Sequence, residues 1–296
     1  MLQDDRLTIV KKSFPQLEIN EVQINNKGWD NDILIINNEI VFRFPKSEQL
    51  LTKVLNEMQI LHHLALKKTS IKIPKYEPVY SDSRLIGVKY PLINGESLSE
   101  VSDCLLNEKL ENAKLISDFL TKLHSIDCSN MNETTLETIH TPYYWERLYT
   151  SVKHDVFPFL STYQKNEISE VFISFINNYS NLSYQKTIIH GDLTASNIIY
   201  NKTLNRIEGI IDFTDAQFGD PAFDFAGLYW TFGPDFTKEV LSFYTSLESS
   251  DSIFKRVSSF YGLQPVFHEL LYALKNEQKI NWESALDRFF QLKLLL

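Results

Sequence analysis

Three polar side chains near the middle of the sequence have the types and the spacing that phosphoryl transfer requires. Asp192 lies in the stretch His190-Gly-Asp-Leu-Thr-Ala-Ser-Asn197, five residues before Asn197, and Asp212 follows fifteen residues after that amide. Transfer from a nucleotide needs a carboxylate that orients and deprotonates the attacking hydroxyl. It also needs an amide oxygen and a second carboxylate that hold Mg²⁺ on the triphosphate. The pattern therefore indicates nucleotide-dependent phosphoryl transfer.

The segments around these residues predict how they are brought together. Residues 186–189 have the composition of a short strand that leads into the loop of Asp192. Residues 197–200 and 206–211 are typical of two further strands, and the polar residues 201–205 form the turn between them. A hairpin of this kind places Asn197 and Asp212 at the same open end.

Length and composition limit the class of protein. A chain of 296 residues with 43% hydrophobic residues fits a globular protein of two unequal lobes. No apolar run approaches the roughly 20 residues that span a membrane, and the first six residues are too acidic and polar for a signal peptide. We expect a cytoplasmic protein, a monomer, with no membrane or nucleic-acid partner.

The net charge of −9 is unevenly distributed. Residues 1–95 carry 13 Lys and Arg against 11 Asp and Glu, whereas residues 96–296 carry 16 against 27. The first part suits a polyphosphate, and the acidic second part repels nucleic acid and favours a cationic small molecule. The alternative is that the acidic residues only keep the larger lobe soluble.

The hydrophobic pattern changes once along the chain. Residues 1–90 are expected to form a small lobe in which a long helix begins after Ser47 and ends near Leu66. Pro91-Leu-Ile-Asn-Gly95 breaks the pattern and is the expected hinge, and residues 96–296 form a mainly helical lobe. The expected strands are 19–24, 33–36, 39–44 and 84–90, and the expected helical segments are 107–126, 142–159, 164–179, 221–230, 236–244, 252–261 and 282–294.

These motifs together resemble the aminoglycoside phosphotransferase family, which are relatives of protein kinases that phosphorylate small molecules. The resemblance rests on His190-x-Asp192-x₄-Asn197 with Asp212, and on segments before and after this set. It extends over most of the chain and is nearest in pattern to the 2''-phosphotransferases, with macrolide phosphotransferases next. It implies an α+β, bilobal protein-kinase-like fold with a small antiparallel sheet plus helix and a larger helical lobe.

The resemblance also implies roles for the residues of the motif. Asp192 corresponds to the catalytic base or hydroxyl-orienting group, and Asn197 and Asp212 to the Mg²⁺ ligands. Asp215 matches an acidic residue that faces the amines of the substrate. His190 is expected to be structural. Asp220 and Asp224 are expected to cap and anchor the following helix, and a metal or substrate role is the alternative for these two.

The small lobe is expected to supply the clamp for the triphosphate. Kinase-like proteins pair a basic residue of the third strand with a glutamate of the following helix, and Arg43 and Glu57 match these places. Most of these families have lysine where Arg43 stands, and a guanidinium is a planar fork rather than a compact donor. Lys46 could serve instead, and the alternative reading of Arg43 and Glu57 is a surface ion pair.

The hinge is expected to bind the base of the nucleotide. Tyr90 matches the residue that gates the purine pocket, and a bulky side chain there is similar to relatives that favour GTP over ATP. Backbone groups of Leu92 and Ile93 would contact the base, because Pro91 has no N–H. The loop of residues 25–32 has a single glycine and is no Walker-type phosphate loop.

We therefore expect a small-molecule kinase that uses Mg²⁺ and ATP or GTP to phosphorylate a hydroxyl of an aminoglycoside-type antibiotic. The expected partner is this small-molecule substrate, which can be cationic. Transfer to a macrolide is the first alternative, since Arg43 and the aromatic residues 228–232 fit it. A metabolic alcohol or sugar is also open as acceptor. A catalytically silent nucleotide-binding protein is the alternative from another class.

Overall fold

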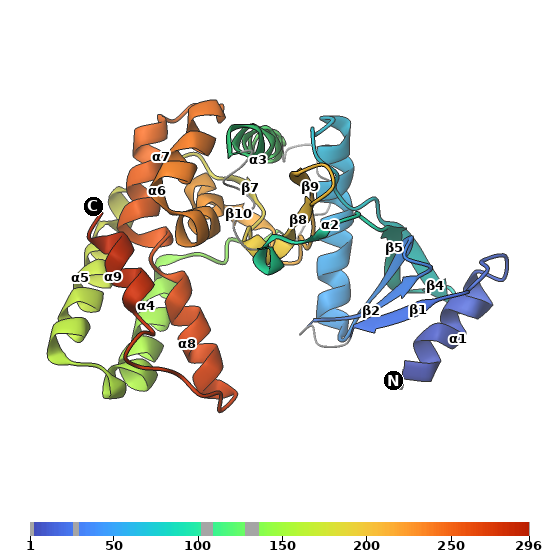
Figure 1. Cartoon of the computed structure of the whole chain (residues 1–296), viewed down its shortest axis with the longest axis horizontal. Coiled ribbons are helices and arrows are strands. Elements are labelled where there is room, and N and C mark those ends of the chain that lie inside the picture. The colour runs from blue at the N-terminus through green and yellow to red at the C-terminus, as the bar shows by residue number, and fades with distance from the viewer. Residues whose placement is uncertain (1–2, 26–29, 102–108, 128–135, 296) are drawn as a thin grey trace.

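A five-stranded antiparallel sheet and the helices α1 and α2 form the first part of the chain (Figure 1). This computed structural model describes residues 3–25, 30–101, 109–127 and 136–295. The spatial order of the strands is β1-β2-β3-β5-β4. Their bounds are β1 (Val22–Asn25), β2 (Asn31–Ile36), β3 (Ile40–Pro45), β4 (Glu77–Ser81) and β5 (Arg84–Pro91). The sequence predicted each of these strands except β4.

One helix packs on each of the two faces of the sheet. Helix α1 (Gln3–Ser13), which the sequence did not predict, places Val10 in a core with Phe42 and Phe44 of β3. Because side chains alternate along a strand, Arg43 between these two phenylalanines points to the other face. Helix α2 (Glu48–Leu66) begins as predicted at Ser47, whose Oγ accepts a hydrogen bond from the N–H of Leu50.

A short connection joins the sheet to the second part of the chain. Strand β5 ends at Pro91, and β6 (Glu96–Ser97) already pairs with β8 of the larger part. Gly95 in this connection has a φ of +143°, and a Cβ atom there would lie 2.5 Å from the carbonyl oxygen of Tyr200. The close approach therefore requires glycine where the chain passes from one part to the other.

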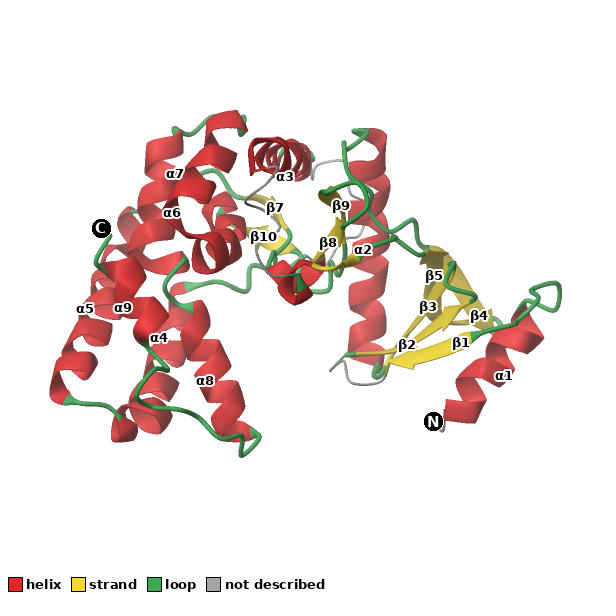
Figure 2. Ribbon diagram, viewed as in Figure 1, coloured by secondary structure: helices red, strands yellow, loops and turns green. Residues whose placement is uncertain are grey.

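The second part is mainly helical, and most of its helices lie on one side of two small sheets (Figure 2). None of the helices in the described ranges is both long and apolar enough to cross a membrane. The helices are α3 (Lys109–His124), α4 (Pro142–Ser151), α5 (Thr162–Asn178), α6 (Ala226–Phe243), α7 (Ser250–Arg256), α8 (Pro265–Lys275) and α9 (Asp287–Lys293). The strands are β6, β7 (Thr187–Ile189), β8 (Ile198–Asn201), β9 (Arg206–Ile210) and β10 (Gln217–Gly219).

Several predicted helices have other bounds in the structure. The segment 142–159 is α-helical only to Ser151 and continues as a π turn and a 3₁₀ turn, where Pro158 lacks an N–H. The segments 221–230 and 236–244 are joined, since α6 runs through a kink at Gly233, whose φ is 82° and which precedes Pro234. Helix α8 was not predicted.

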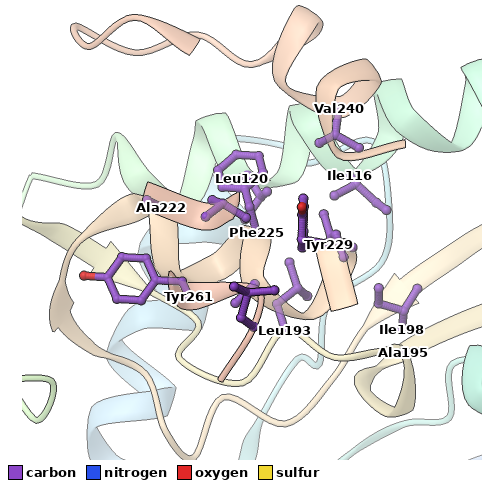
Figure 3. Packing of buried hydrophobic residues seen from close by; sticks show 14 of the residues in the cluster. Ile116, Leu120, Leu193, Ala195, Ile198, Ala222, Phe225, Tyr229, Val240 and Tyr261 are labelled. Carbon is purple, nitrogen blue, oxygen red and sulfur yellow. The ribbon is translucent and has the colours of Figure 1, made fainter. Parts of the chain in front are cut away.

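The loop of Asp192 packs on the hydrophobic core of this second part. Leu193, the next residue in the chain, is buried in one apolar cluster with Leu120 of α3 and with Phe225 of the turn before α6 (Figure 3). A Cβ atom on Gly227 would lie only 2.2 Å from the carbonyl oxygen of Leu193. A glycine at this position of α6 therefore lets the helix pack directly on the backbone of the loop.

Candidate active site

The predicted hairpin is present and positions the two expected metal ligands. Strands β8 and β9 pair with Ile198 opposite Ile210, and the N–H of Ile211 donates to the carbonyl oxygen of Asn197 at 3.0 Å. Asn197 directly precedes β8, and Asp212 follows β9 after one residue. The two side chains therefore come from the same open end of the hairpin, as expected from their spacing.

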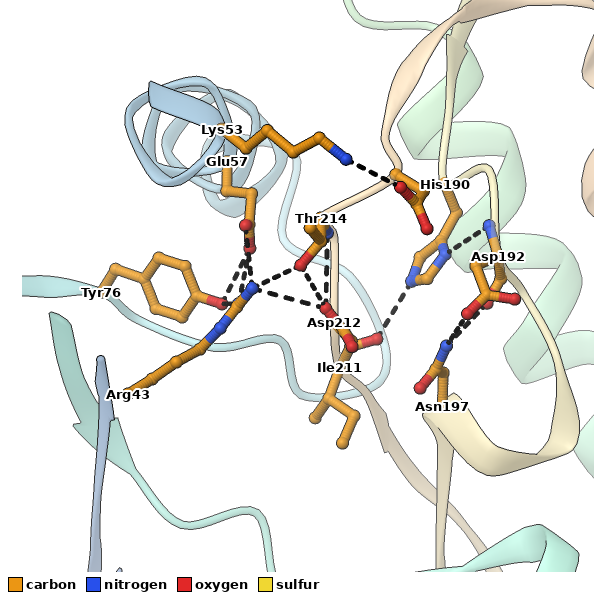
Figure 4. Close-up of polar contacts among 11 residues, drawn as sticks. Arg43, Lys53, Glu57, Tyr76, His190, Asp192, Asn197, Ile211, Asp212 and Thr214 are labelled. Carbon is orange, nitrogen blue, oxygen red and sulfur yellow. Dashed lines mark hydrogen bonds and ion pairs between the residues drawn. The ribbon is translucent and has the colours of Figure 1, made fainter. Parts of the chain in front are cut away.

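Asp192 and Asn197 are directly connected. The amide nitrogen of Asn197 donates at 2.8 Å to the carboxylate of Asp192 and at 2.8 Å to its carbonyl oxygen. Because both hydrogens of this nitrogen are used, the amide oxygen is turned away from Asp192 (Figure 4). An amide oxygen and the carboxylate of Asp212 are hard oxygen donors, and this donor set fits Mg²⁺.

Burial perturbs the titration of the expected catalytic carboxylate. The pKa of Asp192 is raised to about 6, mainly by removal from solvent, and the carboxylates of Asp215 and Asp212 contribute to the rise. His190 and the amide of Asn197 oppose this shift. A carboxylate with this pKa is ionised at neutral pH and is a better proton acceptor than an ordinary aspartate.

His190 and Asp224 hold the backbone of the catalytic loop. His190 is fully buried, and its Nε2 lies 3.1 Å from the carbonyl oxygen of Ile211. The carboxylate of Asp224 accepts hydrogen bonds from the N–H groups of His190, at 2.7 Å, and Gly191, at 2.9 Å. The expectation that Asp224 caps the following helix is therefore wrong, because its oxygens face back to the loop.

Asp224 is itself fixed by a buried histidine that the sequence did not assign to the site. His124 Nε2 lies 3.0 Å from the carboxylate of Asp224, and His124 Nδ1 lies 2.7 Å from the hydroxyl of Tyr244. Burial favours the neutral acid, but the hydrogen bonds from His124 and the loop amides outweigh it and lower the pKa of Asp224. Asp224 is therefore held as a carboxylate beneath the loop.

Asp220 caps the 3₁₀ turn Pro221–Phe225, which leads into α6. Its side chain accepts a hydrogen bond from the N–H of Ala222 at 2.9 Å. The same carboxylate forms a bidentate pair with Arg256 at 2.7 and 2.9 Å. Asp220 thus anchors this segment to α7, a contact between residues 36 apart that no motif indicated.

Arg43 and Glu57 form the predicted pair between β3 and α2. The guanidinium donates to both carboxylate oxygens, at 2.8 and 3.1 Å. The exposed fractions of the two side chains are 4% and 2%, so the alternative of a surface ion pair is wrong. Lys46 Nζ lies 3.9 Å from Asp32, and its role as an alternative phosphate ligand stays a prediction.

The residues expected to bind the base of the nucleotide lie at the end of β5 and directly after it. Tyr90 on β5 packs against Tyr76, with ring centroids 5.2 Å apart, and burial raises the pKa of Tyr90 to about 12. The N–H of Leu92 donates to the carbonyl oxygen of Glu39 at 2.7 Å. This N–H is therefore not available to the base, whereas a contact by the other backbone groups of Leu92 and Ile93 stays a prediction. The side chain of Ile93 is buried; residues 26–29 of the expected phosphate loop lie outside the described residues.

Asp215 faces the first lobe of the protein. Lys53 of α2 places its Nζ 3.1 Å from the carboxylate of Asp215 (Figure 4), and both side chains are about half exposed. Lys53, Glu57 and Thr214 line a cavity of 420 Å³ between α2 and the segment after Asp212. Sequence reasoning missed Lys53 and Thr214, although Thr214 stands only two residues after Asp212.

The fold is kinase-like. A small antiparallel sheet with one long helix is joined by a short hinge to a helical lobe, and this lobe carries Asp192, Asn197 and Asp212. The sequence model of the phosphotransferase enzyme family matches residues 21–249. The chain therefore belongs to this family.

Individual relatives agree with this assignment. The GDP complex of an aminoglycoside 2'-phosphotransferase-IIIa has a similar structure, with a TM-score of 0.80 and 23% identity over 100% of this chain and 99% of that one. A macrolide 2'-phosphotransferase from Brachybacterium faecium gives a TM-score of 0.66 and 18% identity over 97% and 98% of the chains. Viomycin phosphotransferase of Streptomyces vinaceus is 26% identical over 100 residues, which span 33% of this chain and about a third (34%) of that relative.

Proposed function

We propose that the protein transfers the γ-phosphoryl group of a nucleoside triphosphate to a hydroxyl of an aminoglycoside-type antibiotic. The observation that carries this proposal is the placement of Asp192, Asn197 and Asp212 around one end of the β8–β9 hairpin. Structures with the same fold supply the substrate class, since one of them is the GDP and kanamycin complex of an aminoglycoside phosphotransferase (TM-score 0.78, 24% identity over 98% and 99% of the chains).

The residues divide the chemistry between them. Asp192 accepts the proton of the acceptor hydroxyl while the oxygen of that hydroxyl forms a bond to the γ-phosphorus. The bond from this phosphorus to the bridging oxygen of the nucleoside diphosphate breaks in the same step. Asn197 orients the carboxylate of Asp192 through the 2.8 Å hydrogen bond. Asn197 and Asp212 would hold Mg²⁺, which neutralises charge on the phosphates when it is bound.

The nucleotide is expected between the sheet and the helical lobe, beside the hinge of residues 91–95. Tyr90 restricts the space there, and we propose GTP as the preferred donor for this reason, with ATP as the alternative. GDP is bound in two similar structures, which supports a guanine nucleotide, and ADP and ATP are bound in two others, which supports the alternative. Asp215, which perturbs the pKa of Asp192, is the proposed contact for an ammonium group of the acceptor.

A macrolide is the second candidate acceptor, and one contact favours it. Lys53 already neutralises Asp215, so the site offers less net negative charge to a polycation than its aspartates alone would. A macrolide carries fewer ammonium groups than an aminoglycoside and depends less on such charge. The fold is compatible with this acceptor, because a macrolide 2'-phosphotransferase has the same architecture.

A phosphoryl-transfer screen with purified protein tests the proposal. Kanamycin, gentamicin, a macrolide and small alcohols are each offered with ATP and with GTP, and product is detected by mass spectrometry. We expect transfer to an aminoglycoside and a loss of about 10²- to 10⁴-fold for Asp192→Asn. Asp251→Asn, which removes an exposed carboxylate from α7, is the matched control. Transfer only to alcohols, or equal rates for Asp192→Asn and wild type, would overturn the proposal.

A further inference from the structure

Arg43 lies in a closed network that leaves no terminal N–H for a ligand. Nη1 donates to Glu57 and to the hydroxyl of Tyr76, and Nη2 donates to Glu57 and to the hydroxyl of Thr214. Each terminal nitrogen carries two hydrogens, so these four bonds use all of them. A phosphate could accept a hydrogen bond from either terminal nitrogen only by displacing a protein oxygen in a buried site.

The same network continues to Asp212. The hydroxyl of Thr214 accepts from Arg43 and donates to Asp212 Oδ1 at 2.6 Å, and Arg43 Nη2 lies 3.5 Å from that oxygen. The hydroxyl can serve both partners in one orientation only, which fixes its side chain. Asp212 has a φ of 63°, a left-handed conformation that its local contacts must hold in place.

We propose that Arg43 is a positioning residue, which acts through Thr214 to fix the carboxylate of Asp212, and that the phosphates of the nucleotide are bound by other groups. The inference rests on the proposed function in taking Asp212 as a metal ligand. Oδ1 of Asp212 is held by Thr214, and Oδ2 is left for the cation. A guanidinium that moved to a phosphate would leave the carboxylate of Glu57 buried and unpaired, which is costly.

This assignment gives the arginine a reason that the phosphate clamp does not. A guanidinium can hold Glu57 with two parallel bonds while the second hydrogen of each terminal nitrogen points to Tyr76 or to Thr214. A lysine ammonium has three donors in a tetrahedral arrangement and cannot satisfy all of these partners. If Arg43 bound phosphate instead, lysine would be an adequate replacement.

Calorimetric binding of GDP, measured in EDTA and over a series of Mg²⁺ concentrations, separates the two roles. We expect Thr214→Val to raise the Mg²⁺ concentration for half-maximal enhancement of GDP binding by about 10- to 100-fold, with affinity in EDTA unchanged. Thr214→Ser, which retains the hydroxyl, restores the wild-type requirement. Arg43→Lys should follow Thr214→Val. If Arg43→Lys does not fold, the two Thr214 variants decide, since neither changes a charge.

The opposite result is equally specific. Weaker GDP binding in EDTA for Arg43→Lys, with a wild-type Mg²⁺ requirement in Thr214→Val, would make Arg43 a phosphate ligand and overturn the inference. Wild-type protein that binds GDP without any Mg²⁺ enhancement would also overturn it. The experiment needs no acceptor, so absence of transfer to every antibiotic would refute the proposed function and leave this result standing.

Discussion

Lys53 and Asp215 form an ion pair that joins α2 of the first lobe to the segment after the metal loop. Lys53 Nζ lies 3.1 Å from Asp215 Oδ1, and the exposed fractions of the side chains are 41% and 48%. A pair this exposed contributes little stability, because both charges remain partly solvated. A cationic acceptor can therefore compete with Lys53 for the carboxylate at a small cost.

Replacement of Lys53 by methionine is expected to improve the use of polycationic acceptors. Removing the competing cation frees Asp215, so the KM for kanamycin should fall by about two- to five-fold, which corresponds to the free energy of an exposed pair. The KM for a neutral alcohol should not change. Steady-state kinetics at a saturating nucleotide concentration measure both quantities.

Two controls belong to this experiment. Lys11→Met removes an exposed lysine of α1 and should leave both KM values unchanged. In an Asp215→Asn background, Lys53→Met should have no further effect, because the carboxylate that Lys53 competes for is gone. A fall in the KM for kanamycin that persists in that background would assign Lys53 a different role.

Asp224→Asn tests the support beneath the catalytic loop. The carboxylate receives the N–H groups of His190 and Gly191 and contacts His124, and an amide would point a donor at one of these groups. We expect a loss of about 1–3 kcal/mol in the free energy of unfolding, together with a lower kcat and an unchanged KM for the nucleotide. Urea unfolding and steady-state kinetics measure the two effects.

Tyr244→Phe is the matched variant, since it removes only the hydroxyl at the far end of the same chain of contacts. It should cost less, about 0.5–1.5 kcal/mol, and change kcat little. An Asp224→Asn protein with wild-type kcat would show that the loop amides do not depend on this carboxylate.

How far sequence reasoning reached depended on the distance between the interacting residues. The hairpin was predictable because strand composition, a polar turn and two terminal ligands all lie within residues 186–212. Helix α2 was predictable from Ser47 and its apolar spacing. Helix α1 was not, because it contributes few buried apolar residues, with Val10 among them, and lacks a clear helical pattern.

The contacts that sequence reasoning missed join residues far apart. Arg43 and Thr214 are 171 positions apart, and Lys53 and Asp215 are 162 apart, so no local pattern connects them. The contact of the Leu92 N–H has the same origin, since its acceptor is the carbonyl oxygen of Glu39, which lies 53 positions earlier and just before β3. Residue types identified the reaction, but the partners of each side chain followed only from the packed structure.

Gly227→Ala tests whether α6 must touch the catalytic loop. The added Cβ would lie 2.2 Å from the carbonyl oxygen of Leu193, and this contact is to backbone, which cannot turn aside. Either α6 or the loop must shift, so we expect a loss of about 1–3 kcal/mol of stability and a lower kcat, because Leu193 follows Asp192. Ser242→Ala, on the exposed face of α6, should stay within about 0.5 kcal/mol of wild type.

Chemical denaturation followed by fluorescence gives the stability of both variants. A Gly227→Ala protein with wild-type stability and kcat would mean that the loop tolerates displacement at Leu193. A Gly227→Ala protein with wild-type stability but a reduced kcat would instead show that the substitution acts through the position of Asp192.

His140 is expected to make the fold sensitive to acid. Burial lowers the pKa of His140 to about 3, with a contribution from His268, and its ring lies 3.9 Å from that of Phe223 between centroids. An unfolded chain binds the proton with a pKa near 6.5. The folded state therefore binds fewer protons below this pH. The contribution of neutral His140 to stability is complete above pH 6.5 and is lost as the pH falls toward 3.

Between pH 6.5 and 5 this one group should remove about 1–2 kcal/mol from the free energy of unfolding. His140→Phe cannot take up a proton, so its stability should fall less over the same interval, by about that difference. His62→Gln, which removes an exposed histidine of α2, should keep the wild-type dependence. Urea unfolding at a series of pH values measures the slopes, and parallel curves for His140→Phe and wild type would contradict a neutral, partly buried His140.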